Sequence, residues 1–144
     1  MSKLISYWDD ARKNIFAGIE IVADAVKVTM WPKWRNVMLE KSYGGPTITN
    51  DGVTVAKEIE LEDKYQNIWA AIVKEAAEKT NKEAGDGTTS TVVLTHAMAK
   101  EWLRYIRSWV NPFALGRGLH KTVDKLIEEL RHNTKVLKNK EEIK

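Results

Sequence analysis

The chain has 144 residues, of which 43% are hydrophobic and 30% charged, a composition typical of one globular domain rather than of a disordered chain. It has no cysteine, which excludes disulfides, thiolate metal sites and thiol catalysis. The net charge is +3 with basic and acidic residues interspersed, and neither a long apolar run nor a signal peptide is present, so we expect a cytoplasmic protein with no nucleic-acid and no membrane partner.

The first part of the chain is predicted to form a helix followed by a β hairpin. Apolar residues recur at helical spacing after Asp9, which with Asp10 is an expected cap, and Pro32 is the expected end. These residues are Ile15, Ile19, Val22 and Val26. Short strands are predicted at 36–40 and 47–49, joined by a glycine-containing loop.

Three more helices are predicted after the hairpin. One starts near Asp63 and stops at Gly85, the next runs from 88–90 towards Ser108, and the last begins at Asn111, which precedes a proline. The residues predicted to face the core are Tyr65, Ile68, Ile72 and Ala76 in the first of these helices, and Leu119, Val123, Leu126 and Leu130 in the last. The predicted fold class is mainly α, a helical bundle with a small β hairpin.

The segment 84–91, Ala-Gly-Asp-Gly-Thr-Thr-Ser-Thr, has the features of a phosphate-binding loop. Glycines let backbone amides approach an anion, and a helix N-terminus supplies free donors and the positive end of a dipole. Asp86 would be repelled by phosphate unless a hard cation lay between them, so a bridging magnesium ion is one interpretation. The alternative is that Asp86 and Thr88 only cap helices beside a C-terminal glycine.

Other polar residues carry weaker signals. Asn50-Asp51-Gly52 offers a second carboxylate, but Asx-Gly is predicted to be only a tight turn after the second strand. His96, His120 and His132 are too scattered for a metal motif and are predicted to lie on the surface.

Six short motifs occur in the order and spacing of a known family. They are Asp24–Thr29, Arg35–Val37, Pro46–Thr49, Asp51–Val53, Glu58–Asp63 and Ala84–Thr89. Together they resemble the group I chaperonins, the GroEL type, from about residue 9 to about residue 130. The resemblance implies that residues 1–134 are the N-terminal half of a chaperonin equatorial domain and that 135–144 are a charged tail leading towards the intermediate domain.

The resemblance also implies which residues bind ATP. The matching positions are Thr29, Met30, Trp31, Pro32, Asn50, Asp86, Gly87, Thr88, Thr89 and Ser90. Among them, Asp86 matches the magnesium ligand, while Thr29, Asn50 and Thr89 are expected near a potassium ion. Asp51 matches a carboxylate near the γ-phosphate that supports catalysis. The family's main catalytic aspartate lies in the intermediate domain, so this chain alone is expected to release no phosphate from ATP.

The implied function of a full-length subunit is ATP hydrolysis coupled to the folding of non-native polypeptides. The expected partners are identical subunits in two stacked seven-membered rings, a co-chaperonin lid and unfolded clients, and the hairpin is expected to pair with a neighbouring subunit. A helical interaction module that has lost ATP binding is the alternative hypothesis, and a basic nucleic-acid binder is a third.

All six tryptophans stand where the family typically has glycine. They are Trp8, Trp31, Trp34, Trp69, Trp102 and Trp109. Because tryptophan cannot replace the conformational freedom of glycine, we predict that each is encoded by UGA, which certain bacterial lineages read as glycine. In the phosphate loop, glycine at position 31 would let the backbone approach an anion.

Overall fold

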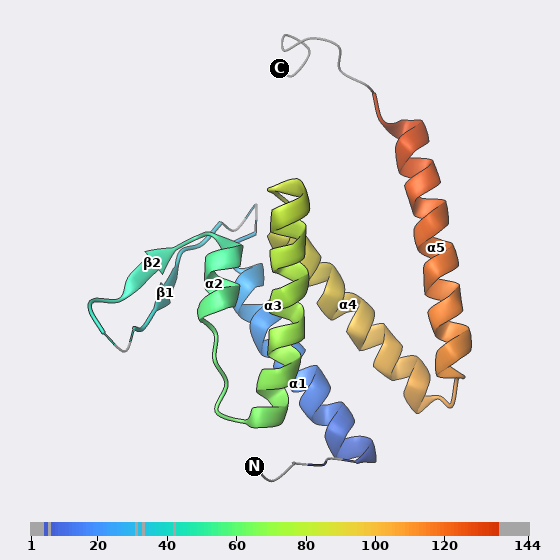
Figure 1. Ribbon diagram of the computed structural model, residues 1–144, viewed down its shortest axis with the longest axis horizontal. Helices are drawn as coiled ribbons and strands as arrows, with labels where there is room; N and C mark the ends of the chain where they lie inside the picture. The colour runs from blue at the N-terminus through green and yellow to red at the C-terminus, as the bar shows by residue number, and fades with distance from the viewer. Residues whose placement is uncertain (1–4, 6, 31, 33, 42, 136–144) are drawn as a thin grey trace. The chain divides into compact units, whose positions relative to one another are not determined.

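The computed structural model describes residues 5, 7–30, 32, 34–41 and 43–135, without the side chains of residues 8 and 9. The chain divides into two compact units, Met1–Leu103 and Arg104–Lys144, which are described separately. Its elements are α1 (Trp8–Lys27), β1 (Val37–Leu39), β2 (Thr47–Thr49), α2 (Gly52–Glu58), α3 (Lys64–Ala84), α4 (Thr88–Arg107) and α5 (Pro112–Asn133) (Figure 1). The prediction of a mainly α fold with a small hairpin is confirmed.

Helix α1 differs from its predicted ends. Its N-cap is Tyr7, which makes no side-chain cap bond, so neither predicted aspartate is the cap. The helix ends at Lys27 rather than at Pro32, because the amide and the hydroxyl of Thr29 both donate to the carbonyl of Val26, at 3.0 and 2.8 Å. These bonds tighten and close the last turn.

The hairpin follows the predicted pattern. Strands β1 and β2 pair antiparallel with Met38 opposite Ile48, and Figure 1 shows the hairpin extending away from the helices. Met38 and Ile48 are exposed on one face, whereas Val37 and Leu39 on the other pack against the core.

Helix α2 was not predicted, because Asp51 and Gly52 were interpreted as a turn. The Asp51 carboxylate instead caps this helix by accepting from the amides of Val53 and Thr54, at 3.3 and 3.1 Å. A helix of seven residues is too short to show a helical period in the sequence.

The core of the first unit lies mainly between α1 and α3, which pack side by side (Figure 1). Its buried members are Ile19, Val22, Ala23 and Val26 of α1, Val55 and Ala56 of α2, Ala70, Val73 and Ala77 of α3, and Val92 of α4. A Cβ atom built on Gly18 would lie 2.2 Å from the carbonyl oxygen of Gln66, so glycine lets α1 and α3 approach closely.

The predicted buried face of α3 was wrong. Ile68 and Ile72 are exposed, whereas the helix buries Ala70, Val73 and Ala77. Alanines and a valine, rather than the larger isoleucines, form the buried face. The ends of α3 are as predicted, with Asp63 as N-cap and Gly85 as a left-handed C-cap.

In the second unit, Asn111 caps α5 through bonds to the amides of Phe113 and Ala114, at 2.9 and 3.3 Å, which confirms the predicted start. The predicted buried stripe is wrong, because α5 buries no residue. Val123, Leu126 and Leu130 are exposed, and only Leu119 of that stripe is half-buried.

The turn before α5 explains one tryptophan position. The amides of Trp109 and Val110 donate to the carbonyls of Ile106 and Tyr105, both at 3.1 Å, which is the bond pattern of a Schellman motif. Trp109 has a φ of 61° at the position where glycine is usual. Trp34 also has a positive φ, 37°, so the backbone favours glycine at both residues.

Trp8, Trp69 and Trp102 do not share this geometry. Trp69 and Trp102 lie within α3 and α4 and are half-buried, and Trp8 is the first residue of α1. Trp31 lies outside the described residues.

Candidate functional site

Three segments far apart in the sequence meet around Gly52. A Cβ atom built on Gly52 would lie 2.2 Å from Thr89 Oγ1 and 3.2 Å from Val26 Cγ1. The N-terminus of α2 therefore contacts the first turn of α4 and the last turn of α1. The sequence did not single out Gly52 as a site residue, because the contacts that require a glycine here are long-range.

The first turn of α4 presents backbone donors. Its N-cap position is Gly87, with a φ of 80°, and its first backbone bond runs from the amide of Thr91 to the carbonyl of Gly87, at 2.9 Å. The amides of residues 88–90 precede that bond, so they have no carbonyl four residues earlier in the helix. Glycine also has no side chain to accept from them, whereas Asp51 and Asp63 do so for α2 and α3.

Asp86 lies exposed between two glycines with left-handed backbone, Gly85 and Gly87. Its Oδ1 accepts from the amide of Gly87 at 2.6 Å, which is the residue before α4 begins. The predicted C-terminal glycine of α3 is confirmed at Gly85. The carboxylate is therefore held beside the first turn of α4.

The hydroxyl groups of Thr91 and Thr80 tie the start of α4 to the end of α3. Thr91 ends the segment that the sequence singles out, whereas Thr80 was not singled out. Thr91 Oγ1 donates to the carbonyl of Gly87 at 3.0 Å and lies 3.0 Å from Thr80 Oγ1. The single proton of the Thr80 hydroxyl is donated either to the carbonyl of Ala76, at 3.1 Å, or to Thr91 Oγ1. These bonds hold the loop at 85–87 between two helix ends.

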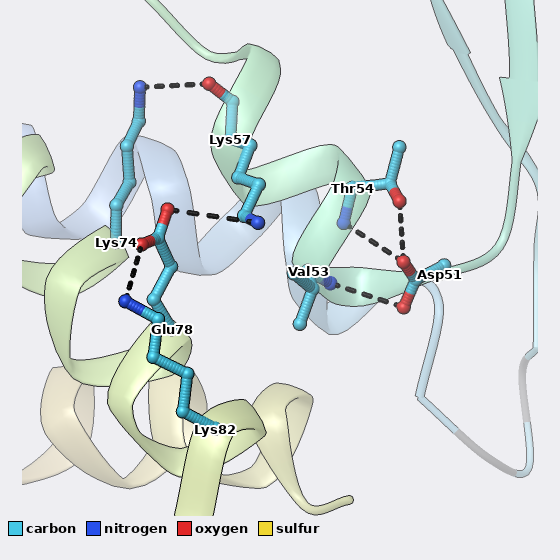
Figure 2. Close-up of polar contacts among 7 residues, drawn as sticks. All are labelled: Asp51, Val53, Thr54, Lys57, Lys74, Glu78 and Lys82. Carbon is cyan, nitrogen blue, oxygen red and sulfur yellow. Dashed lines mark hydrogen bonds and ion pairs between the residues drawn. The ribbon is translucent and has the colours of Figure 1, made fainter. Parts of the chain in front are cut away.

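Asp51 directly precedes Gly52 in the chain and is exposed. Its Oδ2 accepts from the hydroxyl of Thr54 at 2.5 Å, and Figure 2 shows the carboxylate directed at the first turn of α2. This hydroxyl bond, aided by the amides of Thr54 and Val53 and by Lys57 against an opposing effect of burial, lowers the pKa of Asp51 below its ordinary value. The group is therefore ionised at neutral pH.

The predicted phosphate loop after α1 is described only in part. Thr29 is 5% exposed and its hydroxyl donates to Val26, whereas Met30 and Pro32 are exposed. The amide of Arg35 donates to the carbonyl of Val28 at 3.0 Å, which closes the base of this loop. Trp31, a predicted contact, lies outside the described residues.

Asn50 is exposed between β2 and α2, directly before the capping residue Asp51. The amide of Asp51 donates to Thr49 Oγ1 at 3.1 Å, which shapes the junction. Asn50 therefore lies two residues before Gly52, close to the N-terminus of α2.

His96 was predicted to lie on the surface, and this is wrong. Its ring packs against Phe16 with centroids 5.5 Å apart, and its Nε2 is buried without a hydrogen-bond partner. Burial is the main cause that lowers the pKa of His96. It lies on α4, eight residues or about two turns from the first helical residue.

A divalent cation fits this site only with help from a ligand. Among the residues that the structure describes, no three His, Cys, Asp or Glu side chains gather to hold a metal. Magnesium commonly binds through one or two carboxylates with water and phosphate oxygens, and the exposed Asp86 beside the first amides of α4 suits that arrangement. Within the described part of the chain, no helix has the length and apolarity needed to cross a bilayer.

Comparison with known proteins agrees with the motifs. Residues 22–144 match the TCP-1/cpn60 chaperonin family. The structure is similar to a crystal structure of the chaperonin gp146 from the bacteriophage EL 2 (Pseudomonas aeruginosa) in the presence of ATP-BeFx. The TM-score is 0.74 with 33% sequence identity, and the match covers 89% of this chain but 22% of that one. The chain belongs to the TCP-1/cpn60 chaperonin family.

Proposed function

We propose that this chain carries the phosphate- and magnesium-binding part of a chaperonin ATP site. The observation that supports it most is the glycine-capped first turn of α4, where the amides of residues 88–90 precede the first helix bond. Gly52 lies against this turn from a second helix N-terminus, which Asp51 caps. The related phage chaperonin was crystallised with ATP-BeFx, which agrees with nucleotide binding.

The residues present fit Mg-ATP. The amides and hydroxyls of Thr88, Thr89 and Ser90 would bind phosphate oxygens, and Gly87, whose amide donates to Asp86 Oδ1, would let the backbone approach them. Asp86 would hold magnesium, which neutralises phosphate charge when bound. Thr29, Asn50 and Thr89 would hold potassium, and the loop Met30–Pro32 would contact the phosphates.

Asp51 would act near the γ-phosphate as a supporting catalytic residue. Its exposed, ionised carboxylate is held at the N-terminus of α2, where it could orient water towards the phosphate. The main catalytic aspartate is expected outside residues 1–144, so the chain alone would bind nucleotide without releasing phosphate.

We further propose that in a longer subunit this part supports ATP-driven folding of non-native polypeptides. The proposed assembly is two stacked seven-subunit rings in the cytoplasm, with a co-chaperonin lid. The exposed face of the hairpin, with Met38 and Ile48, suits pairing with a neighbouring subunit. Family membership supports this role.

Titration of the 144-residue chain with Mg-ATP tests the proposal. The wild type should bind, Asp86→Asn should lose the magnesium-dependent part of the affinity, and Asp124→Asn on α5 is the matched control. Binding that does not depend on magnesium or on Asp86 contradicts the magnesium assignment. A wild-type chain that binds no nucleotide favours the helical interaction module.

A further inference from the structure

The two ends of helix α2 are held by different kinds of hydrogen bond. Its N-terminus is capped by its own neighbour, Asp51, whereas its C-terminus is held from another helix. The ammonium group of Lys74, on α3, donates to the carbonyl of Lys57 at 3.2 Å and also to the carbonyl of Ile59. Figure 2 shows the Lys74 side chain reaching the end of α2.

These bonds suit the chemistry of a helix end. The last carbonyls of a helix have no amide partner within it and carry the negative end of the dipole, so a cation placed there is favourable. Lys74 is half-buried, and its bonds are therefore less screened by water than those of exposed lysines. It closes the connection between α2 and α3.

A helix of seven residues is not stable by itself in water, so α2 depends on contacts with the rest of the fold. Val53, Val55 and Ala56 bury the inner face of α2, which limits its depth in the core. Apolar contacts are non-directional, so the polar bonds at the two ends add directional constraints on how the helix is tilted. Lys74 supplies those bonds at the C-terminal end.

The tilt of α2 affects the contact between Gly52 and Thr89, because there is no free space between the two residues. Its backbone lies so close to Thr89 that an added Cβ would be 2.2 Å from the hydroxyl oxygen. If the far end of α2 moves, the first turn of α2 must move against or away from α4, and Asp51 moves with it. Any such movement changes the separation between Asp51 and the amides of residues 88–90.

We infer that Lys74 is a positioning residue that sets the place of Asp51 at the phosphate site through α2. The inference rests on the proposed nucleotide site. Lys74 itself acts on the backbone of α2, at the end of that helix opposite Asp51.

The neighbouring ion pairs provide a matched control. Glu78 lies on α3 one turn after Lys74, and its carboxylate oxygens are 3.8 Å from Lys57 Nζ and 4.0 Å from Lys82 Nζ (Figure 2). These side chains are 40–78% exposed, and pairs of that kind contribute little to stability. Glu78→Gln therefore changes the same helix surface without removing a bond to the α2 backbone.

The test compares Lys74→Met, Lys74→Arg and Glu78→Gln in the 144-residue chain. The first readout is hydrogen exchange of the α2 amides without nucleotide. Lys74→Met should speed exchange about tenfold, because two bonds to a charged donor are lost. Lys74→Arg, which keeps a charged donor, and Glu78→Gln should both exchange like the wild type.

The second readout separates positioning from a general loss of structure. Affinities for Mg-ATP and Mg-ADP are measured by calorimetry for each variant. Because the ionised Asp51 carboxylate repels the γ-phosphate, which ADP lacks, Lys74→Met should shift the ATP affinity by about tenfold as Asp51 moves, while ADP binding by the α4 turn stays within twofold. An equal loss for both nucleotides, or unchanged ATP binding, overturns the inference.

Failure of the proposed function gives a different result. A wild-type chain that binds neither nucleotide overturns the nucleotide site and, with it, the positioning role for Asp51. A wild type that binds both, together with α2 exchange in Lys74→Met that matches Glu78→Gln, overturns only the inference about Lys74.

Discussion

Gly52 on α2 and Thr89 on α4 are in contact without room for a methyl group between them, since an added Cβ would lie 2.2 Å from Thr89 Oγ1. This contact brings two helix N-termini together. The obstructing hydroxyl belongs to a β-branched side chain, which has few alternative rotamers in a helix. The backbone of one helix or the other must shift when the methyl group is added.

We predict that Gly52→Ala destabilises the chain by about 1–3 kcal/mol, the usual cost of overpacking. Denaturant unfolding followed by circular dichroism measures the change. Gly118→Ala on α5, where nothing lies within 4 Å of an added Cβ, is the control and should be neutral or stabilising. A Gly52→Ala chain as stable as the wild type would show that the helices separate at no cost.

Trp109→Gly should stabilise the turn between α4 and α5 by about 1 kcal/mol, because glycine removes the cost of a left-handed backbone. The side chain is 93% exposed, so little packing is lost. Thermal unfolding provides the measurement. Trp102→Gly, within α4, should instead destabilise, since glycine in a helix costs about 1 kcal/mol. The prediction fails if both variants shift the midpoint in the same direction.

We predict UGA codons at all six tryptophan positions. Positive φ values at Trp34 and Trp109 support glycine at these two, whereas the helical positions rest on the family pattern alone. Sequencing the gene and mass spectrometry of the protein from its native host decide the matter. UGG at Trp34 or Trp109 would mean that tryptophan occupies a left-handed position in the cell.

Acidification should destabilise the packing of α4 on α1 through His96. The folded state lowers the pKa of His96 and so favours the neutral ring. The contribution of the neutral ring to stability is therefore complete above 6.5, the pKa of histidine in the unfolded chain, and decreases as pH falls below that value. Lys27 and Lys100 add to the lowering, while Asp24 and Glu20 oppose it. Stability measured by denaturant from pH 7.5 to pH 5 should therefore fall.

The same titration in His96→Gln should fall less steeply, because that side chain does not ionise. His120→Gln, an exposed histidine on α5, is the matched control and should follow the wild type. Parallel curves for the wild type and His96→Gln would exclude His96 as the source of the pH dependence.

Asp51→Ala should cost about 0.5–2 kcal/mol, the usual effect of removing an N-cap. Asp51→Asn keeps a capping oxygen and should retain most of that stability. The folded state lowers the pKa of Asp51 below 3.8, the value in the unfolded chain. The charged cap therefore stabilises the fold fully above pH 3.8, and this stability is lost as pH falls through the pKa of Asp51 in the folded state. In acid unfolding the wild type should be the most stable, followed by Asp51→Asn and then Asp51→Ala, and equal stability of all three would exclude the cap.

The sequence predicted helix ends best where capping residues are local. Asp63 and Gly85 for α3, and Asn111 for α5, lie where the structure has them. The failures concern tertiary contacts. Helix α2 depends on its Asp51 cap and on Lys74, and neither bond appears as a periodic pattern.

The buried faces could not be inferred from hydrophobicity alone. In α3 the larger residues Ile68 and Ile72 are exposed, while two alanines and a valine are buried. Hydrophobicity alone does not show which face of a helix packs against its neighbour. The candidate site was found from Asp86 and its glycines, which are adjacent in sequence. The contact of Gly52 with Thr89 joins positions 37 residues apart in the numbering, so only the folded chain shows it.

The close approach of Gly18 to Gln66 has a consequence for how the chain folds. Joining these residues closes a loop of about 50 residues that contains the hairpin and α2, and the entropic cost of closure grows with the logarithm of loop length. Helices α1 and α3 can each form early from local contacts, but their pairing is a non-local event of the kind that slows folding. A side chain at residue 18 would obstruct the pairing of α1 with α3 during folding as well as in the native state. Gly18 therefore affects the folding rate as well as the packing of the two helices.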